Sequence, residues 1–523
     1  MTAVSAYARA RAAATGVAQP IASVRHLHLV ERPLVFIPLG MAGEANAPLA
    51  AMVGSDPDHP TLLVVPQPRN RDLRFAFAAQ LAAILLPYVN QFAPPRPEPA
   101  ETGEAAEADD KTDSKTGGEG KGAEGRAGAD VPVAADAPQL LVPNRTGIEF
   151  VRLLGRSTRF RRTEGEYAVP PSVPLLGQWL TFFADQAEHP GSCLLLAATE
   201  ALALHWATGQ SALEDAHLAS LMAWIEPPPG LTAPEAARQA EDPLLWPPAG
   251  PATDPGFDNE VLAPAIRAYD ASEPGSAARR RAVAALEHAL RGQLEPTWNL
   301  MWRAVARLRK LPPGASVEGR WAEDRRRFSG FHAYVEDGGP PKARRDGAVA
   351  AARRLTWLER AQTEYESSRA FDDPLVMANY RVTGEAFVGT VVEVDRERRV
   401  ANSRGNLVTR PLVTLRTEDP ALLADGTKVV ATTRRKQEGV VRSIERLPGQ
   451  TLVTLELSGG MGRSKVPPPG TVPEPGEVLC YCSVLAENIP SPRLPGVEET
   501  PWTHGGPPES YTPNDDDAGE VWE

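Results

Sequence analysis

The stretch RRLTWLERAQTEYESSRAFDDPLVMANYRVTGEAFVGTVVEVD, residues 353–395, changes its hydrophobic period from that of a helix to that of a strand. Small or apolar residues and one glutamine recur at helical spacing around its first half, at Ala350, Ala351, Leu355, Leu358 and Gln362. Charged residues fill the positions between them, which predicts one long charged helix from about Asp346 to Phe371. The Asp-Asp-Pro sequence at 372–374 ends this helix, because the residue before a proline avoids the α region.

Beyond a joint at Leu375–Tyr380 the period becomes two, which is typical of strands in a sheet. The predicted strands are 387–395, 412–415, 428–431, 439–444 and 452–457. Turn residues separate them at Gly405, Asp425-Gly426 and Pro448-Gly449. Roughly six or seven short strands joined by tight turns predict a small β-barrel or sandwich.

A charged helix that leads into a small β-barrel resembles the stalk and inserted barrel of superfamily-one helicases of the nonsense-decay type. The matching pieces are the helix that ends near Phe371, the strand Gly389–Asp395 and the hairpin Val440–Leu457, about a quarter of the chain. Such helicases need a phosphate-cradling G-x-x-x-x-G-K-[ST] loop. The sequence has none, since Gly120-Lys121 is followed by Gly122. The resemblance therefore implies a nucleic-acid-handling appendage without the motor.

The fold class that we expect is α+β with several domains. The predicted divisions are a flexible leader (1–19), a small α/β unit (20–93), a disordered acidic linker (94–138), a helical domain (139–378), a β-barrel domain (379–486) and a disordered acidic tail (487–523). The linker and tail carry few large apolar side chains, so they cannot bury enough surface to offset the entropy cost of ordering.

Hydrophobic patterns place the elements before the barrel. Strands are predicted at Val24–Val30, Leu34–Ile37 and Leu62–Val65, followed by a helix at Asp72–Val89. Three-four spacing then predicts helices at 146–154, 173–186, 193–206, 213–224, 259–269, 277–290 and 296–311. No regular internal repeat connects them.

The net charge of −12 is concentrated in the linker and tail. Residues 94–138 hold eleven acids and five bases, and residues 486–523 hold nine acids and one base, so the remainder is close to neutral. Three cysteines (Cys193, Cys480 and Cys482) cannot form a disulfide framework, which favours a reducing, cytoplasmic setting. We find no targeting signal and no apolar run long enough to span a bilayer, so no membrane partner is expected.

Residues 279–369 are basic, with nineteen bases and eleven acids. The clusters are Arg279-Arg280-Arg281, Arg325-Arg326-Arg327 and Lys342-Arg344-Arg345, and Trp298, Trp302, Trp321, Phe328 and Phe331 lie among them. Basic side chains neutralise phosphates and aromatic rings stack on unpaired bases, which favours contact with nucleic acid. The alternative is a set of solvated helix faces, with the tryptophans in the core.

Basic loops of the barrel are the second candidate surface. Arg434, Arg435 and Lys436 lie in one loop, and the glycine-rich sequence 459–465 ends with Arg463 and Lys465. Backbone amides of such a loop can hold a phosphate. No helix follows it, so a nucleotide site is not supported, and a plain loop between strands is the alternative.

Candidate metal and catalytic residues are few. His26 and His28 would share one face of a predicted strand, and His59 follows Asp56 and Asp58 in a polar turn. Cys480 and Cys482 would likewise share a strand face. Neither set has the further ligands that a zinc site needs, so we expect a half-exposed strand face and buried small residues instead. The sequence contains no G-x-S-x-G, H-E-x-x-H or kinase motif, and we expect no cofactor or metal.

Together these patterns predict a non-catalytic, cytoplasmic accessory protein that contacts nucleic acid through the basic helical region and the barrel. A helicase or ATPase encoded separately would be its partner. Two alternatives stay open at this point. One is a protein–protein scaffold that binds no nucleic acid, and the other is an enzyme whose active-site residues are too scattered in the sequence to recognise.

Overall fold

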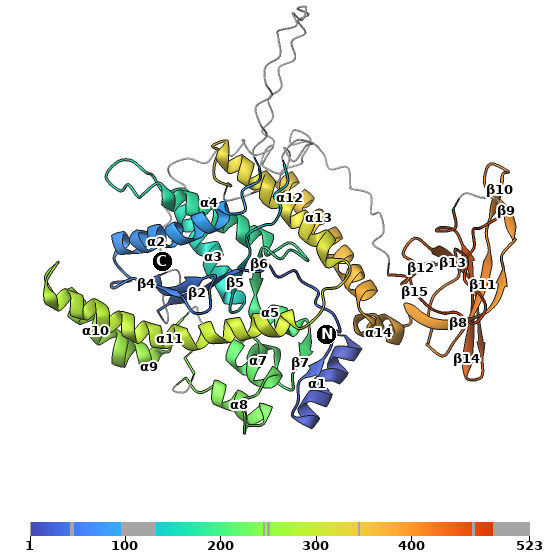
Figure 1. Ribbon diagram of the computed structural model, residues 1–523, viewed down its shortest axis with the longest axis horizontal. Coiled ribbons are helices and arrows are strands. Elements are labelled where there is room, and N and C mark those ends of the chain that lie inside the picture. Colours follow the sequence, from blue (N-terminus) through green and yellow to red (C-terminus); the bar gives the residue numbers. More distant parts are fainter. Residues whose placement is uncertain are drawn as a thin grey trace, which may run out of the picture.

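The computed structural model describes residues 2–41, 47–95, 132–243, 246–247, 252–343, 346–462 and 466–484. In these residues a helical α/β core carries a closed β-barrel at one side (Figure 1). The predicted α+β class, with its central helical region and C-terminal barrel, is therefore confirmed. Residues 96–131 of the predicted linker and the whole predicted tail lie outside the described residues. The end of the linker is ordered, because Ala134 and Ala137 are buried.

A five-stranded sheet of order β4-β3-β2-β5-β6 forms the centre of the core. Its strands are β2 (Leu34–Gly40), β3 (Pro48–Gly54), β4 (Thr61–Val64), β5 (Leu140–Val142) and β6 (Leu195–Ala197). The first three form an antiparallel meander, and β5 and β6 join in parallel. Every residue of β2 is buried, as expected for a strand that is covered on both faces.

Helices cover both faces of this sheet (Figure 1). α2 (Arg71–Asn90), α3 (Arg145–Thr158) and α4 (Ser172–Gln186) pack on one face, and α11 (Ala277–Arg309) crosses β2, β3 and β4 on the other. By length and composition α2 alone among the described helices could cross a membrane. Here it is a core helix, with Phe77, Leu81 and Leu85 buried.

The boundary that we predicted between an α/β unit (20–93) and a helical domain (139–378) does not separate two cores. Leu34 of β2 pairs with Leu140 of β5, so strands from both ranges form one sheet. The same range contributes β6, where we predicted a helix at 193–206. This sequence instead forms β6, the short helix α5 (Ala198–Ala203) and the short strand β7 (Trp206–Ala207). Pairing with a neighbouring strand overrides its helical periodicity.

The predicted flexible leader is wrong, because residues 3–15 form helix α1 (Ala3–Thr15). Thr2 and Ser5 form a capping box at its start. Ala12 is fully buried in a small cluster that contains Trp224, and the Val4 amide donates to the Asn379 side chain at 3.2 Å. The helix was missed because it packs through alanines, which give little hydrophobic periodicity.

Other differences are local. Residues 24–30, predicted as a strand, form no strand and make one isolated bridge, Arg25 to Pro313. The helices predicted at 277–290 and 296–311 are one helix, α11, which continues past Pro296. The remaining elements of the core are β1 (Gln19–Pro20), α6 (Ala212–Asp215), α7 (Leu218–Ile225), α8 (Ala233–Ala240), α9 (Pro255–Phe257), a π-turn (Asp258–Leu262), α10 (Ala263–Asp270) and α12 (Val317–Glu336).

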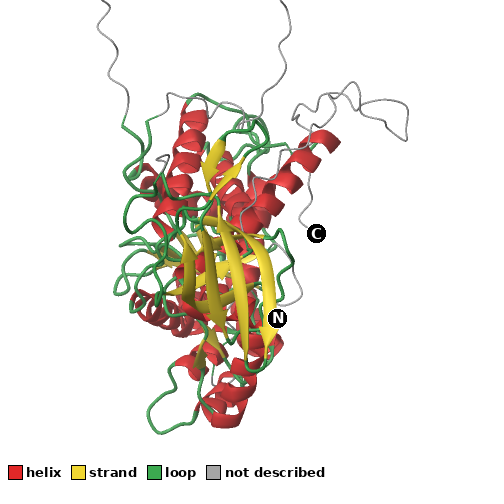
Figure 2. Cartoon of the chain, turned by 90° about the vertical axis from the view of Figure 1, so that its right-hand side faces the viewer, coloured by secondary structure: helices red, strands yellow, loops and turns green. Residues whose placement is uncertain are grey.

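Two helices connect the core to the barrel: α13 (Ala348–Asp372), which matches the predicted charged helix, and α14 (Pro374–Thr383). We placed the start of the barrel at residue 379, but α14 continues to Thr383. The barrel strands are β8 (Ala386–Asp395), β11 (Leu412–Thr417), β12 (Lys428–Ala431), β13 (Glu438–Leu447), β14 (Gln450–Leu457) and β15 (Val478–Cys482). They close into a barrel (Figure 2) in the order β11-β14-β13-β12-β15-β8. Phe387 and Tyr481 are buried in its core.

Candidate nucleic-acid interface

The basic clusters predicted from the sequence lie in three separate places (Figure 1). One is the first turn of α11, one is the middle of α12, and one is the turn between β12 and β13 on the barrel. In the first of these, Arg279 lies over the Tyr269 ring at 3.9 Å and donates to the Tyr269 carbonyl. Arg280 donates to the Gly275 carbonyl, and Arg281 is exposed with no acidic partner in the described part of the chain.

The α12 cluster is already neutralised by acids of the same protein. Arg325 lies 3.4 Å from Glu318, Arg326 donates to Glu323 at 3.0 Å, and Arg327 lies 3.3 Å from Asp324. Each side chain would have to leave its carboxylate before it could bind a phosphate, so the cluster offers little free charge.

Arg327 and its partner are also structural. Asp324 is buried and accepts a hydrogen bond from the Cys193 amide at 2.7 Å. Burial raises the pKa of Asp324 to about 6 and lowers the pKa of Arg327. The Arg327 guanidinium also lies 5.2 Å from the Trp357 ring on α13. Arg327 therefore connects α12 to α13, and its partner Asp324 connects α12 to the segment before β6.

The aromatic residues of this basic region belong mostly to the core. Trp298, Trp321 and Phe328 are buried, and Trp302 and Phe331 are half-buried. They are therefore not arranged as a stacking platform for unpaired bases. Lys342 lies 2.6 Å from Asp185, while Arg344 and Arg345 fall outside the described residues.

Two of the three side chains of the barrel cluster are paired with acids. Arg434 lies 2.7 Å from Glu477, and Arg435 lies 2.6 Å from Asp372 at the end of α13. Lys436 is exposed. The described part of the glycine-rich loop packs on this turn, because a Cβ on Gly460 would lie 2.5 Å from the Lys436 carbonyl oxygen. Arg463 and Lys465, the candidate phosphate ligands of that loop, lie outside the described residues.

A hairpin of the barrel carries basic side chains that sequence reasoning did not select. Strands β9 (Arg399–Ala401) and β10 (Leu407–Thr409) pair in register and extend the β8–β11 hairpin away from the barrel (Figure 1). Residues 395–411 hold five arginines and two acids. Two of the arginines are paired: Arg396 with Glu474 at 3.2 Å and Arg398 with Glu456 at 2.6 Å.

The other three arginines of the hairpin have no acidic partner among the described residues. Arg399 donates to the Leu407 carbonyl and Arg410 to the Thr409 carbonyl, so neither is paired with a carboxylate. Arg404 lies exposed in the turn, and Leu407 beside it is 58 % exposed. The sequence signal is the high density of arginines between residues 396 and 410. It is easily missed, because only two of the five arginines are adjacent.

The candidate metal ligands are not brought together. His26 is buried with Nε2 at 3.3 Å from Asp373, His28 stacks on Trp321 at 4.3 Å, and exposed His59 lies 3.1 Å from Asp56. In the described ranges no three His, Cys, Asp or Glu side chains are grouped as a metal site. Burial raises the pKa of Cys480 to about 11 and that of Cys482 to about 12, so both thiols stay protonated.

Two consecutive aspartates join the core to the barrel. Asp372 accepts hydrogen bonds from the Ser316 amide at 2.9 Å and from Arg435 of the barrel at 2.6 Å. Asp373 accepts hydrogen bonds from the amide and the hydroxyl of Ser23. It also accepts one from the Leu375 amide, which caps the start of α14. Although burial raises the pKa of Asp373, these bonds and His26 hold it well below its ordinary range. Both side chains are fully buried and act as structural acceptors.

Comparison of the chain with protein-family models, with curated proteins and with solved structures gives no match. The resemblance to a helicase stalk and barrel therefore stays a prediction.

Proposed function

We propose that this chain is a non-catalytic accessory protein that contacts nucleic acid chiefly through the β9–β10 hairpin of its barrel. The observation that supports the proposal is the set of three arginines, Arg399, Arg404 and Arg410, that project on a narrow ribbon without acidic partners in the described structure. The proposal includes a cytoplasmic setting and a separately encoded helicase or ATPase as the working partner.

The shape of the hairpin supports a duplex ligand. Neighbouring strands lie about 4.8 Å apart, and the major groove of B-form DNA is about 12 Å wide, so a two-stranded ribbon can enter it. Guanidinium groups on both strands of the ribbon would then face phosphates on the two sides of the groove. Since we identify no base-reading pattern, the contact is expected to tolerate many sequences.

The helical clusters play a smaller part in this proposal than the sequence alone predicted. Arg325, Arg326 and Arg327 would each give up an internal ion pair on binding a phosphate, which offsets most of the gain. Arg280, Arg281 and Lys436 are exposed and can add weak electrostatic contacts.

The test compares two triple variants of the full chain. Arg399, Arg404 and Arg410 are replaced by glutamine in one, and Arg325, Arg326 and Arg327 in the other, so that both lose three positive charges. Binding to a mixed-sequence duplex is measured over a series of salt concentrations. The salt slope is the change of the logarithm of the binding constant with the logarithm of the salt concentration. In the hairpin variant its magnitude should fall by up to about 0.9 for each lost phosphate contact, and the α12 variant should keep the wild-type slope.

Three outcomes would count against the proposal. A reduced slope in the α12 variant alone would move the contact to the helical region. An unchanged slope in both variants would place it elsewhere on the protein. If the wild type binds neither duplex nor single strands at low salt, the nucleic-acid function is abandoned and the protein–protein scaffold becomes the better hypothesis.

A further inference from the structure

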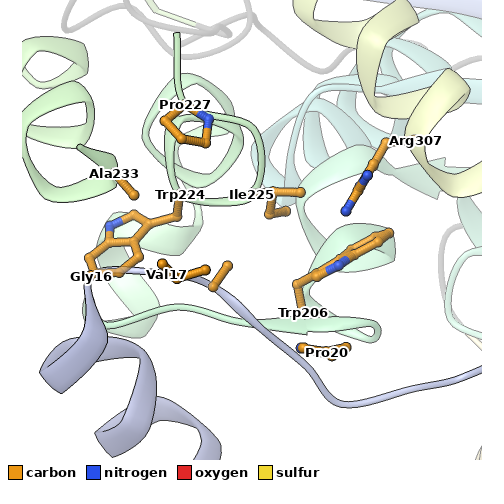
Figure 3. A pocket seen from close by; sticks show the side chains of 10 residues that line it. Gly16, Val17, Pro20, Trp206, Trp224, Ile225, Pro227, Ala233 and Arg307 are labelled. Atoms are coloured by element: carbon orange, nitrogen blue, oxygen red, sulfur yellow. The ribbon is translucent and has the colours of Figure 1, made fainter. Parts of the chain in front are cut away.

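A cavity of about 240 Å³ opens where the end of α1, β7, α7 and α11 meet (Figure 3). It lies in the core, on elements that do not contribute to the β9–β10 hairpin. Its walls are mainly apolar, and the residues that matter here are Val17, Pro20, Trp206, Trp224, Ile225 and Arg307. Trp206 is 7 % exposed and Trp224 is 6 % exposed, so both indoles are held by the surrounding core.

Two residues that line the cavity each carry a buried donor that has no acceptor in the described structure. The indole Nε1 of Trp224 is buried without a hydrogen-bond partner in the described structure. The Nε of Arg307 is likewise buried and without a partner. A buried donor that finds no acceptor destabilises the folded protein, so an acceptor for the Arg307 guanidinium would be a stabilising contact.

Arg307 differs from the other arginines at the end of α11. Its guanidinium lies 5.3 Å from the centre of the Trp206 ring and points into the cavity (Figure 3). Arg303, one turn earlier, lies 3.4 Å from Glu226, and Arg309 donates to the carbonyls of Val30 and Glu31. Within the described ranges Arg307 has no carboxylate and no hydrogen-bonded acceptor of its own. The cavity therefore presents a positive charge for which the protein provides no counter-ion.

We propose that this cavity binds a small organic carboxylate with a flat apolar body. The apolar part would pack against the two indoles, Val17 and Ile225, and the carboxylate would supply the acceptor that Arg307 lacks. Guanidinium groups bind carboxylates through paired, charge-assisted hydrogen bonds, and indole faces stack on flat rings. The cavity is smaller than most drug-sized pockets, so the ligand is a molecule of fragment size. The proposal does not depend on the nucleic-acid function.

The test uses two probes that differ in charge but hardly in shape, 3-phenylpropionate and 3-phenylpropanamide. Binding to the full chain is followed through the indole N–H signals in a nitrogen–proton correlation spectrum. The variant Arg307→Gln removes the charge. Arg303→Gln is the matched control, since it removes an exposed charge from the same helix one turn away. Thermal unfolding of each variant checks that the fold is intact.

The carboxylate should shift the Trp206 and Trp224 signals and bind at least about tenfold more tightly than the amide. Arg307→Gln should remove most of this preference, and Arg303→Gln should keep it. Equal affinity for the two probes would overturn the proposal, as would an unchanged preference in Arg307→Gln. Shifts confined to other tryptophans, or no binding of the carboxylate at millimolar concentration, would overturn it as well.

Discussion

The core and the barrel differ in how their β-strands are connected along the chain. In the barrel three of the six neighbouring pairs, β8 with β11, β12 with β13 and β13 with β14, are antiparallel pairs of strands that follow one another along the barrel sequence. In the core β2 pairs in parallel with β5, which begins about a hundred residues later, and β6 follows after two further helices. The barrel therefore closes within the single stretch 386–482, while the core sheet joins strands spread over residues 34–197 and separated by helices.

This difference is tested most directly by cutting the chain. A fragment of residues 382–485 should fold, because it contains all six barrel strands and their closed hydrogen-bond ladder. A fragment of residues 20–93 should not fold, because β2 would lose β5 and the helices α3 and α11 that cover it. Amide dispersion in nitrogen–proton spectra of the two fragments would show the contrast. A folded 20–93 fragment would mean that our predicted unit boundary was correct after all.

The same difference explains which parts of the fold could be predicted. The barrel strands alternate apolar and polar residues and are separated by glycine turns, so the sequence itself carries their signal. The meander strand β3, with the sequence PLAAMVG, was missed because its proline and alanines have little strand preference, whereas the equally buried β2 contains a run of large apolar residues. The sequence of β6 has helical periodicity, and only the partner β5 makes it a strand. The information for the core is thus in contacts between distant residues.

The candidate sites, like the core strands, depend on contacts that the sequence does not show. Runs such as Arg325-Arg326-Arg327 are conspicuous in the sequence, but whether they are free depends on acids that the fold brings near them. Glu323 and Asp324 could have been noticed, since they lie three or four residues from these arginines on one helix. The pairing of Arg435 with Asp372 could not be predicted from the sequence, because it joins residues 63 positions apart. Trp206, Trp224 and Arg307 likewise meet only in the folded core.

The joint between the two regions should produce the largest effect of a single substitution. Asp373→Ala removes the acceptor of Ser23 and Leu375 and leaves His26 without its partner. We expect the unfolding free energy of the core to fall by ~3 kcal/mol. The unfolding free energy of the barrel should stay unchanged. Tryptophan fluorescence in urea reports the core, since eight of the ten tryptophans precede the barrel and none lies within residues 386–484.

The control for this substitution is Asp395→Ala, at an exposed end of β8. It should change the unfolding free energy of either region by less than about 0.5 kcal/mol. An equal loss in both variants, or a barrel transition that moves together with that of the core, would show that the two regions unfold as one unit.

Between pH 7 and pH 5 the neutral His205 should by itself lower the unfolding free energy of the core by about 2 kcal/mol, with no counterpart in the barrel. Burial lowers the pKa of His205 to about 4, so this histidine stays neutral in the folded core. The unfolded chain takes up a proton as the pH falls through about 6.5, so this contribution to stability is complete above that pH and is lost toward pH 4. Residues 386–484 contain no histidine, so the barrel should keep its stability between pH 6.5 and 5. Urea unfolding at pH 7 and pH 5 measures both.

The matched variant is His205→Gln, because glutamine can still accept the hydrogen bond from the His26 amide. It should reduce the loss of core stability between pH 7 and 5 without affecting the barrel. An unchanged pH dependence would assign the effect to the other core histidines whose pKa burial lowers, which are His28, His189 and His217.

The smallest expected effect distinguishes two kinds of glycine within the barrel. Gly460 and Gly449 both have a φ of +78°, so alanine is strained by about 1 kcal/mol at either position. Only at Gly460 would the added Cβ meet backbone, 2.5 Å from the Lys436 carbonyl oxygen, while nothing lies within 4 Å at Gly449. Gly460→Ala should therefore destabilise the barrel by roughly 1 kcal/mol more than Gly449→Ala. The difference would be measured as the midpoint of amide signal loss in urea for strands β12 and β13. Equal midpoints would mean that the glycine-rich loop does not pack on the Arg434–Lys436 turn in solution, and the loop would return as a candidate phosphate site.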